Sequence, residues 1–258
     1  CIQEIREWML ANYLKLNDSK TEFLVVGSTK QLPKVKDCTI QIGDATIRAA
    51  DSARNIGAVF DDKMCMKQHV NSICKACYLH LRNIGKIRNY LTRRATVTLV
   101  HAFIASKLDH MNSILYGIPK AVLNKLQKIQ NNAARIISQT RRCDHITPVL
   151  AELHWLPVEK RIEYKILLTT FKALHGLAPG YIRDLITPYE PRRSLRSLEL
   201  NLLQKPRSRT KSYGDRSFAV SSPHLWNKLP LSLRQIHELE SFKVDLKTHL
   251  YRQCFDSM

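Results

Sequence analysis

The chain has 258 residues, and its 41 lysines and arginines outnumber its 22 aspartates and glutamates to give a formal charge of +19. A hydrophobic fraction of 44% with only eight glycines excludes a disordered or fibrous chain. No apolar run reaches the roughly 18–20 residues of a membrane span, so we expect no membrane partner. An excess of bases on this scale favours a polyanion, with nucleic acid ahead of an anionic membrane surface.

The cysteines and the first residues bear on the compartment and on the extent of the chain. Seven cysteines, an odd number at irregular spacing, are typical of a reducing compartment rather than of a secreted disulfide scaffold. We therefore expect an intracellular protein, in the nucleus, the cytoplasm or both. The chain begins at Cys1 with a helical pattern already running and without a signal-peptide layout, so we expect it to be part of a longer protein.

Short strands are predicted early in the chain, after an opening helical segment with apolar residues at 2, 5, 9 and 13. Residues 21–27 indicate a buried strand. Residues 39–47 alternate around Gly43 and Asp44, a pattern typical of a β-hairpin. Residues 56–60 form one more short apolar run. The first sixty residues therefore predict a small β element.

Helical spacing replaces this pattern for the rest of the chain. It predicts helices over 69–87, over 94–115, and from Pro119 to about residue 137, with proline in the first turn. Thr147 and Pro148 open a short helix, residues 158–175 a longer one that Gly176 ends, and residues 241–251 a last one. The predicted fold is α+β and mostly helical, with a small antiparallel β element at the N-terminus.

Charge divides the chain into three predicted regions. Residues 1–62 hold eight bases and nine acids, residues 63–142 hold fifteen bases and one acid, Asp109, and residues 143–258 hold eighteen bases and twelve acids. The last region includes a Pro- and Arg-rich stretch over 191–216 that we expect to be an extended linker. Eighty residues with one carboxylate leave self-repulsion almost uncompensated, which favours nucleic-acid binding through the middle region.

The bases of this middle region are the candidate binding residues. Side chains on rigid helices can follow a phosphate backbone without reading its sequence. Tyr78 and Tyr90 lie near them in the sequence and suit either stacking on bases or packing in the core. The candidates are Arg82, Lys86, Arg88, Arg93, Arg94, Lys120, Lys125, Lys128, Arg135, Arg141 and Arg142.

Two patterns suggest metal sites, and each has a simpler interpretation. Asp61 and Asp62 follow a strand, as the Mg²⁺-binding carboxylates of polymerases do, but they also stand where acids stabilise the start of a helix. The cluster Cys65, His69, Cys74 and Cys77 has short spacings like those of zinc ligands. Its last two cysteines lie on an apolar helical stripe, where a free thiol packs as a small hydrophobe. We predict no metal site in this chain and keep a structural zinc module over 65–77 as an alternative.

Loops that would indicate other enzymes are missing from the sequence. It contains no G-x-x-x-x-G-K-[ST] or G-x-G-x-x-G phosphate loop and no G-x-S-x-G nucleophile turn.

Several longer strings carry a family resemblance. Residues 14–23, LKLNDSKTEF, resemble motif D of the reverse transcriptases of non-LTR (LINE-type) retrotransposons, and residues 55–61, NIGAVFD, are similar to motif E. Residues 107–119 and 126–135 resemble the region that follows the polymerase core in jockey-like elements. Similar strings continue to the end of the chain, at 145–148, 153–157, 171–179, 213–218 and 225–230. Isoleucine at position 56, where the family more often has leucine, and His110, where it commonly has tyrosine, are mild departures.

The resemblance implies a fragment of an RNA-directed DNA polymerase. Residues 1–62 would be a palm remnant, 63–142 the thumb on a template–primer duplex, and 143–258 a helical C-terminal region. Ile56, Gly57 and Val59 would be the primer grip, and Lys20 the motif D lysine that assists pyrophosphate departure. The catalytic aspartates would precede Cys1, with Mg²⁺ a cofactor of the full-length parent and none in this chain.

The expected partners are RNA, RNA–DNA or DNA duplex, and the upstream polymerase and endonuclease segments of the parent protein. We expect no polymerisation by this chain alone, so whether it counts as an enzyme stays open. The alternatives are a stand-alone nucleic-acid-binding protein, an inactive relic of a truncated element, and the zinc module.

Overall fold

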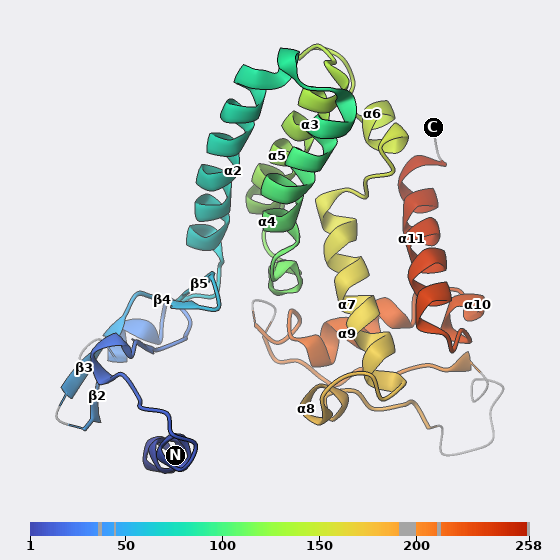
Figure 1. Ribbon diagram of the computed structural model, residues 1–258. Helices are drawn as coiled ribbons and strands as arrows, with labels where there is room; N and C mark the ends of the chain where they lie inside the picture. Colours follow the sequence, from blue (N-terminus) through green and yellow to red (C-terminus); the bar gives the residue numbers. More distant parts are fainter. Residues whose placement is uncertain (36–37, 44, 191–199, 211–212, 257–258) are drawn as a thin grey trace. The chain divides into compact units, whose positions relative to one another are not determined.

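The computed structural model describes residues 1–35, 38–43, 45–190, 200–210 and 213–256. The chain divides into two compact units, Cys1–His69 and Val70–Met258. Helices predominate and the strands lie near the N-terminus, which confirms the predicted α+β, mostly helical fold (Figure 1). Asp44 of the predicted hairpin turn, and residues 191–199 and 211–212 of the predicted linker, lie outside the described residues. The predicted boundaries at 62 and 142 stay predictions.

The first unit is built around short strands. Strand β3 is central, with β1 parallel to it on one side and β2 antiparallel on the other, and the predicted hairpin over 39–47 is the β2–β3 pair. The strand predicted over 21–27 is confined to two residues. The elements are α1 (Ile2–Ala11), η1 (Asp18–Lys20), β1 (Phe23–Leu24), η2 (Leu32–Val35), β2 (Thr39–Ile42), β3 (Ala45–Ala50), β4 (Ser52–Asn55) and β5 (Ala58–Asp61).

A tight hairpin joins β4 to β5. Ser52 pairs with Asp61 and Asn55 with Ala58, which leaves Ile56 and Gly57 as a two-residue turn. Both have positive φ, 46° and 83°, as a type I′ turn requires. Glycine adopts this conformation freely, whereas a β-branched isoleucine is strained there.

Helices form the second unit, and α2 runs into it from the first. The helices predicted over 69–87, from Pro119 and over 158–175 are present as α2, α5 and α7. The elements are α2 (Lys67–Ile87), η3 (Arg88–Tyr90), α3 (Arg93–Val100), the π-helical turn η4 (His101–Ala105), α4 (Ser106–Asp109), η5 (Asn112–Leu115), α5 (Lys120–Ser138), α6 (Thr147–Glu152), α7 (Val158–Leu174), α8 (Gly180–Arg183), α9 (Phe218–Trp226), α10 (Leu231–Arg234) and α11 (Leu239–Phe255).

The helix predicted over 94–115 is wrong after residue 109. The helical run passes through the π turn and ends at Asp109. Met111 then takes a left-handed conformation with φ of 50°, which an α-helix of L-residues does not accept, and a short 3₁₀ turn follows. Asn112 is consequently carried into the interior, where only 3% of it is exposed.

The core of the C-terminal half lies between α7, α9 and α11. Phe171 stacks on Phe242 with ring centroids 4.2 Å apart, and Trp226 lies 5.9 Å from Phe242. The described part of the predicted linker is fixed to this core. Leu203 is buried and forms a bridge with Pro188, and the side chain of Asn227 bonds both its N–H and its carbonyl.

Candidate nucleic-acid interface

One face of α2 is basic and open to solvent. Arg82 and Lys86, both predicted candidates, are exposed, and Lys75 lies seven residues before Arg82 on the same side of the helix. The opposite side, with Val70, Ile73, Cys77, Leu81 and Ile84, is buried. The prediction missed Lys75, although the i, i+7, i+11 spacing of these three bases was visible in the sequence.

Aromatic and aliphatic side chains stand among these bases. Tyr78 is 47% exposed and Leu79 is 58% exposed on the same face of α2, and Tyr90 beyond its end is 90% exposed. Core packing therefore does not explain either tyrosine. A phenol ring between cations suits contact with a sugar or a base.

Helix α5 presents the second row of bases beside α2. Lys120 and Lys128 are exposed, and the ammonium of Lys125 donates to Asn71 of α2 over 2.8 Å. Near the other end of both helices, Arg88 bonds to the carbonyl of Ile136. Because the early part of α2 meets the early part of α5 and the two late ends also meet, the helices run in the same direction. The bases of α2 and α5 are therefore carried by two parallel helices that meet near both ends.

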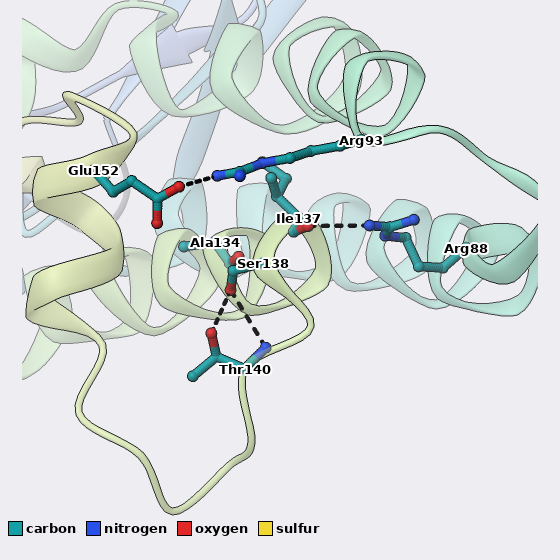
Figure 2. A network of polar contacts seen from close by, with 7 residues as sticks. All are labelled: Arg88, Arg93, Ala134, Ile137, Ser138, Thr140 and Glu152. Atoms are coloured by element: carbon teal, nitrogen blue, oxygen red, sulfur yellow. Dashed lines mark hydrogen bonds and ion pairs between the residues drawn. The ribbon is translucent and has the colours of Figure 1, made fainter.

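Arg88 itself is bound to the protein. Its Nε donates to the carbonyl of Ile136 over 2.8 Å, and its two terminal nitrogens donate to the carbonyls of Leu91 (2.9 Å) and Ile137 (3.1 Å). Figure 2 shows the guanidinium directed at Ile137, at the end of α5. The last carbonyls of a helix have no partner within it, so Arg88 satisfies them and complements the helix dipole.

Arg93 and Arg135 are also held by the chain. Arg93 forms an ion pair with Glu152 of α6, as Figure 2 shows. Arg135 donates to the carbonyls of Arg141 and Asp144 and so closes the loop after α5. Within the same network Ser138 and Thr140 share a 2.6 Å hydrogen bond. Three of the predicted phosphate contacts are therefore part of the polar network that holds this end of the helices.

The remaining bases of residues 63–142 form no ion pair with a described residue. Arg82, Lys86, Arg94, Lys120, Lys128, Arg141 and Arg142 are exposed. Between residues 63 and 142, all of which are described, the only base in an ion pair is Arg93. The single acid of this stretch, Asp109, pairs with Arg161 from outside it. Uncompensated cations on packed helices attract a polyanion strongly at low salt.

The predicted primer-grip residues form the tip and one strand of the β4–β5 hairpin. Ile56 is 76% exposed at the tip and Gly57 follows it. The backbone N–H of Val59 donates to Nδ1 of the buried His69 over 3.4 Å, so this backbone group is already used within the unit. Lys20 is exposed at the end of η1, where the side chain of Asn17 accepts from its backbone N–H.

Asp61 holds the loop before α2 together. Its two carboxylate oxygens accept from the backbone N–H groups of Cys65 (2.9 Å) and Met66 (2.7 Å). Burial alone would raise the pKa of this carboxyl, but these hydrogen bonds outweigh burial and keep the pKa below its ordinary value. The carboxylate thus stabilises the loop that precedes α2, whereas the simpler interpretation places Asp61 and Asp62 at the start of the helix itself.

The cysteines near this loop pack rather than converge. Burial raises the pKa of the Cys77 thiol to about 11, with a smaller contribution from Cys74. Burial also raises the pKa values of Cys65 and Cys74. Across the described ranges, no three His, Cys, Asp or Glu side chains are grouped so as to hold a metal ion.

Comparisons with known proteins identify no family for this chain. No protein-family model matches the chain, and neither the curated proteins nor the solved structures contain a significant match. Among the helices of the described residues, none combines the length and the apolar character needed to cross a bilayer.

Proposed function

We propose that this chain binds RNA–DNA or RNA duplex through the α2–α5 face, defined as Lys75, Arg82 and Lys86 of α2 with Lys120, Lys125 and Lys128 of α5. The observation that carries the proposal is the pair of parallel helices whose exposed bases form no ion pair among the described residues. The groove-lining phosphates of a duplex offer a matching row of charges, and the contact would read the backbone rather than the base sequence.

The wider assignment rests on the resemblance of the sequence to LINE-type reverse transcriptases. In it the first unit is the remnant of a polymerase palm, the α2–α5 face belongs to the thumb, and the protein acts inside the cell on element RNA. The exposed, strained Ile56 at a hairpin tip is consistent with a contact surface, because strained residues persist mainly where function requires them.

A salt titration tests the binding. We expect the affinity for a fluorescent RNA–DNA duplex, measured by polarisation, to fall with a log–log slope of about −5.4, since each of six phosphates contributes about 0.9. A flat salt dependence would contradict the proposal. Equal affinity for an uncharged peptide nucleic acid of the same sequence would also contradict it.

A matched pair of triple variants localises the surface. Replacing Lys75, Arg82 and Lys86 by alanine removes three charges from the α2–α5 face, and should lower the slope by about 3 and the affinity roughly a hundredfold at physiological salt. Replacing Lys15, Lys30 and Lys34 by alanine removes three exposed charges of the first unit and serves as the control. Equal losses in the two variants would mean that net charge alone drives binding.

The polymerase assignment has its own test. If the assignment holds, the gene encodes a strand turn with an Asp-Asp pair just before the codon of Cys1, and the joined product extends a primer on RNA. A preceding sequence without such a turn would leave duplex binding as the function and remove the polymerase assignment.

A further inference from the structure

A cavity with a mixed polar and apolar lining lies in the second unit, apart from the α2–α5 face. It has a volume of about 490 Å³ and is lined by the π turn and η5, by the loop after α6, and by α7 and α11. Helices α7 and α11 pack side by side along it (Figure 1). Two of the strings that resemble the retrotransposon family, 107–119 and 153–157, contribute to its lining, although duplex binding through the α2–α5 face uses neither.

Asn112 is the first sign that the cavity receives a ligand. Asn112 lines the cavity and is only 3% exposed. Its side-chain oxygen Oδ1 has no hydrogen-bond partner among the described residues. A buried amide oxygen without a partner is costly, and proteins seldom keep one without a use. A ligand N–H reaching Asn112 would satisfy it.

The walls of the cavity suit two further parts of one ligand. The ammonium groups of Lys165 on α7 and Lys247 on α11 are exposed and make no ion pair among the described residues, so they suit an anionic group. Arg161 is instead engaged by Asp109, with contacts of 2.8 and 2.6 Å. His101 offers an exposed imidazole ring, steadied edge to face on Trp155 with centroids 5.7 Å apart.

The backbone around the cavity is unusual at the residues that carry these groups. His101 opens the π turn, a feature that is frequent at functional sites. Met111, directly before Asn112, and His154 both have left-handed backbone conformations. Such strain is kept where side chains must be aimed, which agrees with a ligand-binding role.

We propose that this cavity binds one nucleotide, with the phosphate at Lys165 and Lys247, the base edge at Oδ1 of Asn112 and the base plane against His101. A nucleotide combines an anion, a flat ring and N–H donors in one molecule of suitable size. The source is a free nucleotide or the single strand that continues from a bound duplex. The second source rests on the proposed function and would place a single-stranded overhang next to the duplex.

The experiment compares a blunt RNA–DNA duplex with the same duplex carrying a single-stranded RNA overhang. We expect the overhang to tighten binding to the natural protein about five- to a hundredfold, the range for one base held by a protein. Asn112→Leu, and separately Lys165→Ala with Lys247→Ala, should remove this gain and leave blunt-duplex affinity unchanged. Lys243→Ala with Arg252→Ala removes two charges from α11 outside the cavity and should keep the gain.

Thermal unfolding separates a binding role of Asn112 from a structural one. Replacing an unpartnered buried amide by leucine should keep or raise the Tm, whereas a clear drop would show that the fold needs the amide and would count against the proposal. If Asn112→Leu does not fold, the lysine pair decides. A gain from the overhang that survives in the lysine variant overturns the proposal.

Adenosine 5′-monophosphate supplies the arm that is independent of duplex binding. A rise in Tm with this nucleotide, absent from the Lys165→Ala, Lys247→Ala variant, supports the cavity as a nucleotide site even if no duplex binds and the proposed function fails. Duplex binding without either the overhang gain or the nucleotide shift leaves the proposed function standing and overturns the cavity proposal.

Discussion

Basic side chains have opposite roles in two regions of the second unit, at the C-terminal end of α5 and on the α2–α5 face. At the end of α5, Arg88 and Arg135 donate to backbone carbonyls and Arg93 pairs with Glu152. On the α2–α5 face, Arg82, Lys86 and Lys128 point into solvent. A basic side chain that meets unsatisfied carbonyls becomes part of the fold, whereas one that meets only water stays available to a phosphate.

Arg88→Ala should have the largest effect on stability. It removes three charge-assisted hydrogen bonds, and we expect a loss of about 2–3 kcal/mol, or roughly 5–10 °C in Tm, in thermal unfolding. Lys86→Ala, two residues earlier on the exposed side, should change stability by less than about 0.5 kcal/mol. Because a lysine cannot reach three separated carbonyls, Arg88→Lys should recover less than half of the loss. Equal stabilities for Arg88→Ala and Lys86→Ala would erase the distinction between the two regions.

Asp61→Asn extends the comparison to a carboxylate that is bound to its own backbone. An amide accepts with one oxygen instead of two, so we expect a loss of about 1–2 kcal/mol near neutral pH. The pKa of Asp61 in the fold lies below its ordinary 3.8, so this stabilisation is present above that value and is lost as the pH falls through the folded pKa. The stabilities of the variant and the natural protein should therefore converge as the pH falls below the folded pKa. A stability difference that persists at acid pH would mean that the negative charge of Asp61 does not contribute to stability.

Arg93→Ala should have the smallest effect. Both partners of its ion pair are more than half exposed, at 55% and 56%, and exposed pairs contribute about 0.5 kcal/mol or less. The effect should vanish in 1 M salt, whereas that of Arg88→Ala should remain. A large, salt-independent effect of Arg93→Ala would move this arginine into the class of Arg88.

Regular spacing made most of the helices predictable. The helix predicted over 69–87 ends at Ile87, as α2 does, and the one predicted from Pro119 begins at Lys120. Strand β4 was not predicted, because Ser52–Asn55 has no apolar alternation and gains its order from pairing with β5. The break at Met111 was not predicted either, since a left-handed methionine is favoured by its surroundings and not by its own preference.

The candidate site was predictable as a stretch of chain but not side chain by side chain. A deficit of acids over 63–142 pointed to the right helices. Nothing local distinguishes Arg88 from Arg82, because the carbonyl that Arg88 bonds lies 48 residues further along the chain. Asn112 was hidden for the same reason, as its burial depends on a helix that stops earlier than its pattern implies.

The buried thiol of Cys77 provides a probe for the opening of the basic helix α2. A thiol with a pKa of about 11 and no exposed surface reacts with an alkylating reagent only when α2 opens, while the exposed Cys1 and Cys143 react at once. The slow labelling rate at Cys77 therefore measures how often this helix leaves its neighbours. A duplex bound to the opposite side of the same helix should lower the labelling rate of Cys77. This rate therefore measures whether the α2–α5 face is occupied.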